Sequence, residues 1–277
     1  MQQLKVFQSM WAMERRSTRE PELSKAEAIS QIATAGFDGV STHWTEPRTV
    51  ADLHHMLSDH GLAAEGQCFP KTVDDLKPVL DLAQRYPVTH LCLQADIRPR
   101  RVDACVPLLE GWMALGRQTG IPVYIETHRD RMTTDLYFTL DLLDRMPDLP
   151  LLADLSHFLV GREFAYPVSE EDHAYMQRII DQAWAFHGRV ASREQVQIEL
   201  SFPHHEPWVK LFLDWWGYGF RSWKRRAAED ATLIFVCELG PKPYAITGRD
   251  GEDTTDRWRE ALTLKSLAKD LWAAIDP

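Results

Sequence analysis

Four polar residues that can bind a metal ion lie at or near the ends of strand-like apolar segments in the second half of the chain. Glu126 ends VYIE, Asp154 ends LLAD, His187 lies in AFHG, and Glu238 ends FVCE. A carboxylate removed from water costs several kcal/mol unless it is paired, hydrogen-bonded or bound to a cation. Three carboxylates and an imidazole brought together without a cation would also perturb each other's pKa. A divalent metal ion resolves this conflict.

The donor types narrow the choice of metal. Three oxygen donors, one nitrogen and no thiolate favour Mn²⁺, Mg²⁺ or Co²⁺ ahead of Zn²⁺. The alternative for each residue taken alone is ordinary, since a single His187 or Asp154 can be a hydrogen-bonded residue or a helix cap. The four together at successive strand ends are what indicates a metal site.

Short apolar segments that alternate with longer helical patterns should position these residues. Repeated strand–helix units of this kind are typical of a parallel sheet, and eight of them can close into a barrel whose functional residues lie at the carboxyl ends of the strands. We therefore expect one (β/α)8 TIM-barrel domain spanning residues 1–277. The expected strands are 4–11, 39–43, 63–69, 90–95, 123–128, 151–157, 185–191 and 233–239.

The helical patterns carry recognisable start signals. Ser24 and Glu27 predict a capping box before a helix that stops at Gly36, and Ser169 precedes a helical pattern over 169–186. A long connection at about 192–207 leads into an aromatic helix, so that the loop and helix together span about 192–228. Its tryptophans and phenylalanines predict core or oligomer contacts, or else a substrate lid, and make a homodimer plausible.

Composition limits the class of protein. The 277 residues carry a formal net charge of −10, which argues against a nucleic-acid partner. No apolar run approaches the roughly 18 residues that a membrane span needs, and the first residues lack a leader pattern, so we expect a cytoplasmic protein without a membrane partner. The four cysteines show no CxxC spacing and are expected to be reduced, buried thiols.

Other strand ends offer groups for substrate binding. Side chains two apart on a strand share a face, so His128 should lie with Glu126, and Arg189 with His187. Further polar or aromatic residues at the ends of the first four strands could bind or stack on a polyol, or could be satisfied inside the barrel: Trp11, His43, Glu65, Gln67 and Gln94.

The ordered motifs VYIETHRDR, LLADLSH, FHGRV and LIFVCELGPKPY, together with AISQIATAGFDGV near the amino end, resemble the xylose-isomerase-like sugar isomerase/epimerase barrels. The resemblance covers nearly the whole chain. It implies metal ligation by Glu126, Asp154, His187 and Glu238. It also implies substrate contacts from His157 and from an arginine after the metal histidine, which is either Arg189 or Arg193.

The resemblance and the site together predict a reaction on a small carbohydrate. A base next to a polarised carbonyl would remove a proton through an enediolate, giving ketose epimerisation or aldose–ketose interconversion, with Glu126 and Glu238 as the proton-transfer pair. The nearest alternative is a metal-dependent dehydratase or lyase acting on a keto-sugar, inositol or shikimate-type substrate. An endonuclease is disfavoured by the acidic charge and by the absence of further histidine and aspartate ligands. A non-catalytic sugar-binding barrel would tolerate Glu238→Gln.

Overall fold

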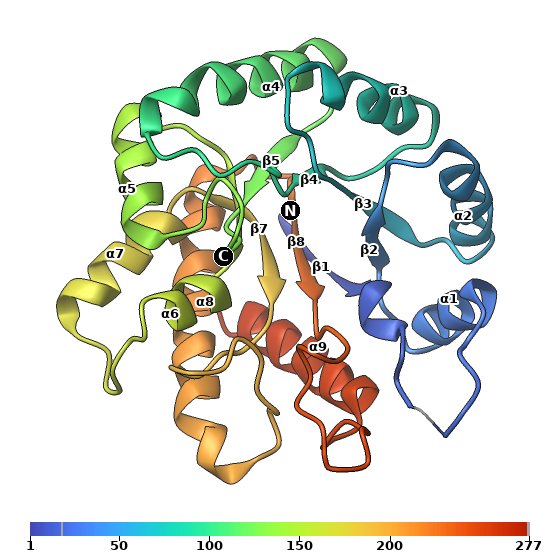
Figure 1. Ribbon diagram of the computed structural model, residues 1–277. Coiled ribbons are helices and arrows are strands. Elements are labelled where there is room, and N and C mark those ends of the chain that lie inside the picture. The colour runs from blue at the N-terminus through green and yellow to red at the C-terminus, as the bar shows by residue number, and fades with distance from the viewer. Residues whose placement is uncertain (18, 276–277) are drawn as a thin grey trace.

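Eight parallel strands form a closed barrel in the order of the sequence, as predicted. The computed structural model describes residues 1–17 and 19–275. Each strand pairs with the next, and β1 pairs with β8 to close the ring. Figure 1 shows the helices arranged around the strands. The strands are β1 Gln3–Ser9, β2 Gly39–His43, β3 Ala63–Cys68, β4 Leu91–Leu93, β5 Val123–Glu126, β6 Leu151–Asp154, β7 Ala183–Gly188 and β8 Thr232–Cys237.

Nine α-helices and four 3-10 turns are found in the described part of the chain. The helices are α1 Lys25–Thr34, α2 Pro47–Asp59, α3 Lys77–Arg85, α4 Val106–Thr119, α5 Leu136–Arg145, α6 Ser156–Gly161, α7 Glu170–Ile180, α8 Glu206–Arg226 and α9 Arg257–Ala273. The 3-10 turns are η1 Trp11–Met13, η2 Asp74–Leu76, η3 Val102–Ala104 and η4 Pro203–His205. Within residues 1–17 and 19–275, no helix has the length and apolar content that crossing a bilayer requires.

Local signals explain several of these boundaries. Ser24 accepts a hydrogen bond from the Glu27 amide while the Glu27 side chain binds the Ser24 amide, which is the predicted capping box. The Ser169 side chain caps α7 by accepting a hydrogen bond from the Asp172 amide. The helix predicted over 169–186 is too long, because α7 ends at Ile180 and residues from Ala183 onward form β7. The first strand, predicted over 4–11, is also shorter at its carboxyl end, because β1 ends at Ser9 and Trp11 begins η1.

Two apolar clusters hold the barrel. The larger fills the space between the strands and the helices. The smaller lies inside the ring of strands and consists of Phe7, Cys92, Leu152, Ala185, Ile234 and Val236. Because side chains alternate along each strand, every second residue points into the barrel interior. At the carboxyl ends of the strands, these inward-facing residues are the polar residues of the candidate site.

The aromatic helix α8 belongs to the core of this chain. The Trp216 ring lies 5.1 Å from that of Phe235 on β8, and the Phe220 ring lies 5.7 Å from that of Phe186 on β7. Edge-to-face pairs of this kind add to the free energy gained from burial. Because these rings are buried against the chain's own strands, they no longer support the prediction of a homodimer.

Candidate metal centre

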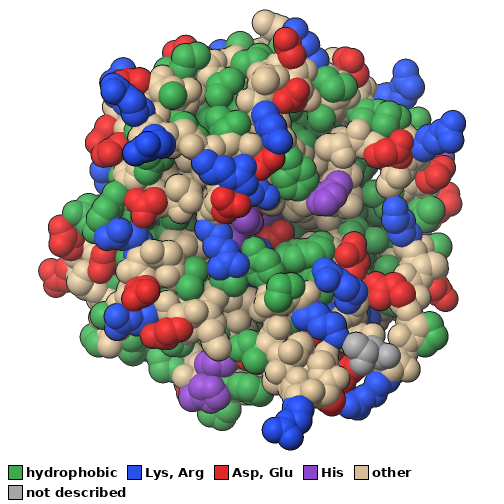
Figure 2. All heavy atoms as spheres, viewed as in Figure 1, with side chains coloured by type: hydrophobic (Ala, Val, Ile, Leu, Met, Phe, Trp, Pro, Cys, Tyr) green, Lys and Arg blue, Asp and Glu red, His purple; other side chains and the backbone are tan. Residues whose placement is uncertain are grey.

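The four predicted ligands converge at the carboxyl end of the barrel. Glu126 ends β5, Asp154 ends β6, His187 lies on β7, and Glu238 follows β8. One ligand atom from each can be chosen so that all four lie within 4.8 Å of one another. All four residues are buried, with exposed fractions of 0 to 4%. In the space-filling view, acidic and histidine side chains lie in a recess near the centre of the face, with basic side chains beside it (Figure 2).

Three of these side chains present a buried atom that has ion-pair contacts but no hydrogen bond of good geometry. These atoms are Glu126 Oε1, Asp154 Oδ2 and His187 Nδ1. The other oxygen of each carboxylate is held, since the Cys92 thiol donates to Glu126 Oε2 at 2.9 Å and the Ser156 hydroxyl donates to Asp154 Oδ1 at 2.5 Å. Buried polar atoms are rarely left unsatisfied. Two oxygens and one imidazole nitrogen facing one space therefore fit a divalent cation.

The charges of the cluster show the same need for a cation. Burial alone would lower the pKa of His187, but the carboxylates of Glu238, Glu65 and Glu126 outweigh it and raise that pKa well above its usual value. Burial would raise the pKa of Glu238, yet His187 and Arg189 lower it to about 2. Burial raises the pKa of Asp154. Without a metal ion, the positive charge that offsets these carboxylates comes partly from protonated His187. A bound divalent ion would supply more positive charge at the same place.

Arg189 lies inside the cluster and does not project freely from it. Its Nη2 atom is 2.6 Å from Glu238 Oε2 and 3.1 Å from Asp154 Oδ2. Its Nε and Nη1 donors are buried and have no hydrogen-bond partner. These two donors can serve a substrate oxygen. Arg193, the other arginine that the sequence offered, is half-exposed and faces Glu163 and Glu194, so of the two only Arg189 is at the cluster.

A pair of histidines borders the cluster. His157, in the first turn of α6, is fully buried, and its Nε2 lies 3.5 Å from Asp154 Oδ2. Burial holds the pKa of His157 well below its usual value, and neither ring nitrogen has a hydrogen-bond partner. The half-buried ring of His128 lies 4.0 Å from it. Glu126, His128 and His157 can also bring one ligand atom each within 4.8 Å.

Two rim residues from the sequence analysis differ in their distance from the cluster. Trp11 is half-buried, and its ring lies 5.8 Å from the Arg189 guanidinium carbon. His43 is the last residue of β2; it is exposed, and its ring packs on that of Phe69. Tyr244, which the sequence analysis did not single out, contacts both the Trp11 ring at 5.1 Å and the Arg189 guanidinium at 4.8 Å.

Glu65 lies deeper than a substrate-binding residue at the rim would. It is fully buried on β3, and both of its oxygens are engaged, by His187 and by His90. Its predicted role as a substrate contact therefore does not match its position. The sequence analysis also missed Cys92 and Ser156, which hold the Glu126 and Asp154 carboxylates. The only signal for them was their place within two residues of a strand end.

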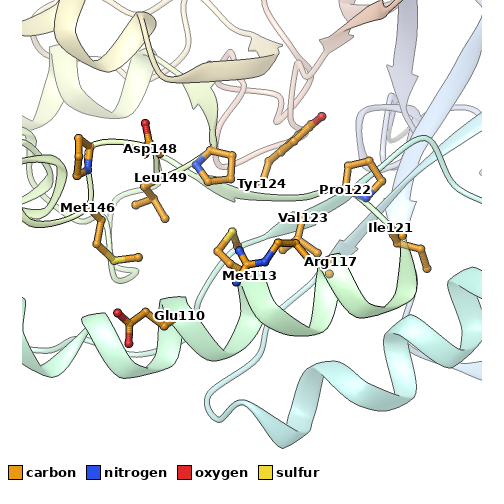
Figure 3. A pocket seen from close by; sticks show the side chains of 14 residues that line it. Glu110, Met113, Arg117, Ile121, Pro122, Val123, Tyr124, Met146, Asp148 and Leu149 are labelled. Atoms are coloured by element: carbon orange, nitrogen blue, oxygen red, sulfur yellow. The ribbon is translucent and has the colours of Figure 1, made fainter.

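A groove elsewhere on the molecule has a different character. It has a volume of about 580 Å³ and is lined by residues of α4 and by the amino ends of β5 and β6, including Met113, Pro122, Val123 and Leu149 (Figure 3). The amino-terminal face of a TIM barrel is associated with stability, and the carboxyl-terminal face with activity. The metal cluster, at the opposite strand ends, is therefore the candidate functional site.

The fold places the chain among known barrels. A xylose isomerase-like TIM-barrel protein from Mycobacterium smegmatis in complex with magnesium matches with a TM-score of 0.60 and 12% identity over 98% of each chain. The chain has the xylose isomerase-like TIM-barrel fold. A sugar phosphate isomerase/epimerase from Parabacteroides distasonis shares this fold with a TM-score of 0.60 and 11% identity, over 99% of this chain and 97% of the other.

A third structure with this fold has a different described reaction. The probable 3-DHS dehydratase AsbF from Bacillus anthracis matches with a TM-score of 0.57 and 13% identity, over 96% of this chain and 98% of its own. No protein-family model matches the sequence, and no curated protein matches it. The similarity at these identities concerns the fold, so the reaction must be argued from the site.

Proposed function

We propose that this protein is a divalent-metal-dependent sugar isomerase or epimerase that moves a proton at the carbon next to a carbonyl group. The observation that carries the proposal is the convergence of four buried side chains, Glu126, Asp154, His187 and Glu238, each of which offers one ligand atom within 4.8 Å of the others. The shared fold with a sugar phosphate isomerase/epimerase and with a magnesium complex supports it.

Four side chains would hold the ion: Glu126, Asp154, His187 and Glu238. A bound divalent ion would polarise a substrate carbonyl and so acidify the neighbouring C–H bond. Oxygen donors in the majority and no thiolate favour Mn²⁺, Mg²⁺ or Co²⁺.

Glu126 and Glu238 are the groups proposed to carry the proton. His187 lies between them, with Nδ1 3.6 Å from Glu126 Oε1 and 3.0 Å from Glu238 Oε2, so the two carboxylates approach the cluster from different strands. The Cys92 thiol orients Glu126 by donating to Oε2. One carboxylate would take the proton to give an enediolate, and the other would return it from the opposite face, which inverts the stereocentre.

His157 and Arg189 are proposed to bind the substrate oxygens. The neutral His157 ring and the free Nε and Nη1 donors of Arg189 are hydrogen-bonding groups without partners at the cluster. Trp11 and Tyr244 border the same space and would cover an apolar face of the sugar. Burial of His157 and Arg189 keeps water away from these contacts, which strengthens each of them.

Solvent-deuterium exchange tests the proposal. Keto-sugars would be incubated with the Mn²⁺-loaded enzyme in D₂O, and deuterium at the carbon beside the carbonyl would be read by NMR. We expect incorporation with the wild type, none with Glu126→Gln, and normal incorporation with the exposed control Glu14→Gln. If Glu126→Gln exchanged a wild-type substrate at an unaltered rate, the proton-transfer role would be refuted.

Elimination is the second candidate, favoured by the fold shared with a probable dehydratase. The same proton abstraction expels a leaving group when one lies beta to the carbonyl. Product analysis separates the two reactions, because elimination releases water and creates a double bond, whereas epimerisation conserves the substrate mass.

A further inference from the structure

A fully buried carboxylate lies behind the metal cluster, on the opposite wall of the barrel from His187. Glu65 Oε1, on β3, is 2.9 Å from Nε2 of His187, on β7. We propose that Glu65 is a positioning residue, which fixes the orientation and tautomer of His187 so that Nδ1 is presented to the metal. This inference rests on the proposed metal centre and assigns Glu65 a role other than ligand or substrate contact.

The two nitrogens of His187 face different surroundings. Nε2 is hydrogen-bonded with Glu65, whereas Nδ1 faces the proposed ligands Glu126 and Glu238 at 3.6 and 3.0 Å. An ionised carboxylate can only accept a hydrogen bond, so a metal ion bound at Nδ1 would leave the ring proton on Nε2, where Glu65 accepts it. The lone pair then lies on Nδ1, directed at the other ligands. Metal-binding histidines commonly have this second-shell carboxylate, which fixes the ring and raises its basicity.

Glu65 is itself held in place. The Ser41 hydroxyl donates to Oε1 at 2.7 Å, and Gln67 donates to the Ser41 oxygen at 3.0 Å. His90 Nε2 lies 2.8 Å from Oε2. The carboxylate therefore has a fixed position.

The position of Glu65 argues against two other roles. It differs from the ligands in its position: its oxygens lie 2.9 Å from His187 Nε2 and 2.8 Å from His90 Nε2, whereas Glu126 and Glu238 face His187 from the Nδ1 side. Stability alone is a weak reason to bury an ion pair here, because replacing such a pair by apolar residues is often neutral or stabilising. The free-energy cost of burying Glu65 is instead explained by its proposed role, which is to orient the His187 ring.

Metal affinity and the histidine tautomer test the inference together. Mn²⁺ affinity would be measured by titration calorimetry for wild type, Glu65→Met and Glu65→Gln. The Gln side chain keeps an oxygen that can accept from His187 Nε2–H, whereas Met has none. We expect Glu65→Met to bind Mn²⁺ about 10–100-fold more weakly and Glu65→Gln to retain most of the affinity. The control Ile234→Ala, in the barrel interior, should lose stability and keep its affinity.

Long-range ¹H–¹⁵N spectra of histidine in the Mg²⁺- or Zn²⁺-loaded protein supply a readout independent of activity. His187 should carry its proton on Nε2 in the wild type and in Glu65→Gln, but not uniquely in Glu65→Met. If Glu65→Met fails to fold, the metal-loaded wild type decides: a His187 ring that carries its proton on Nδ1 would overturn the inference, and a ring that carries it on Nε2 would support it.

The possible failures are distinguishable. Wild-type protein that binds no metal would refute the metal centre, and with it the role of Glu65. Wild-type protein that binds metal, together with a folded Glu65→Met variant of equal affinity and the same tautomer, would refute the positioning role alone.

Discussion

Arg189 Nη2 lies 2.6 Å from Glu238 Oε2 and is almost fully buried, so a fixed cation already shares the space with the candidate metal ligands. The same nitrogen lies 3.1 Å from Asp154 Oδ2. In the metal-free protein, Arg189 and protonated His187 are the cations that face the three carboxylates. A bound metal ion would take over much of that charge compensation.

Replacing Arg189 by Met should therefore destabilise the metal-free protein most. Removing one partner of a buried ion pair costs about 3–5 kcal/mol, because the other charge stays buried and unpaired. Thermal unfolding in EDTA and in Mn²⁺ should show a larger metal-induced rise in Tm for Arg189→Met than for wild type. Arg193→Met, at the half-exposed neighbouring arginine, should behave like wild type. An equal metal-induced rise in all three would contradict this view of Arg189.

Gly188 should not tolerate a side chain. A Cβ atom there would lie 2.3 Å from Phe235 Cζ, next to the His187 ligand. Gly188→Ala should cost about 1–3 kcal/mol or more in the free energy of unfolding, through overpacking. Denaturant unfolding would measure this loss, and the double variant Gly188→Ala/Phe235→Leu should recover part of it. A fully stable Gly188→Ala variant would show that the barrel wall yields more readily than this contact implies.

All four cysteines should be unreactive in the folded protein. They are free and buried, and burial raises the pKa of Cys105 to about 11 and that of Cys68, Cys92 and Cys237 further. The thiolate is the reactive form, so both access and ionisation oppose modification at pH 8. Titration with a thiol-reactive disulfide reagent should detect four thiols per chain in guanidinium chloride and none in the native protein. Rapid modification of any thiol in the native protein would contradict the prediction.

Metal affinity should rise with pH. The pKa of His187 is raised in the metal-free protein, mainly by Glu238 and Glu65 against the effect of burial, so at neutral pH the ring is protonated there. A metal ligand must be deprotonated, so the metal-free state binds more protons and low pH favours it. For one released proton, affinity should increase about tenfold per pH unit between pH 6 and 8. Calorimetry in buffers of different ionisation enthalpy would count the protons, and a pH-independent affinity would contradict this.

The sequence predicted much of the fold because short apolar segments alternate clearly with longer helical patterns along the chain. All eight strands were found, and β2 has the predicted bounds, Gly39–His43. The boundaries that failed have local causes. Trp11 leaves the strand for a 3-10 turn, and Ala183–Gly188 joins the sheet although it continues the helical pattern of α7. Tertiary pairing decides such ends, and one sequence does not record it.

The convergence of the four ligand residues was also predictable, because parallel strands bring their carboxyl ends to one face. The role of Glu65 was not. Alternation shows that a side chain faces the barrel interior but not at what depth, and its partner His187 lies 122 residues away on the opposite wall. Cys92 was interpreted only as a packing residue, because its contact with Glu126 exists only once β4 and β5 are paired.

The metal content of the purified protein tests the central claim most directly. Wild-type protein and variants at the cluster would be equilibrated with Mn²⁺, desalted and assayed by elemental analysis. We expect about one divalent ion per chain in the wild type and in the control Glu14→Gln, and loss of that ion in Asp154→Asn and Glu238→Gln. Wild-type protein that takes up none of Mn²⁺, Mg²⁺, Co²⁺ or Zn²⁺ would contradict the metal centre and the proton-transfer function proposed for it.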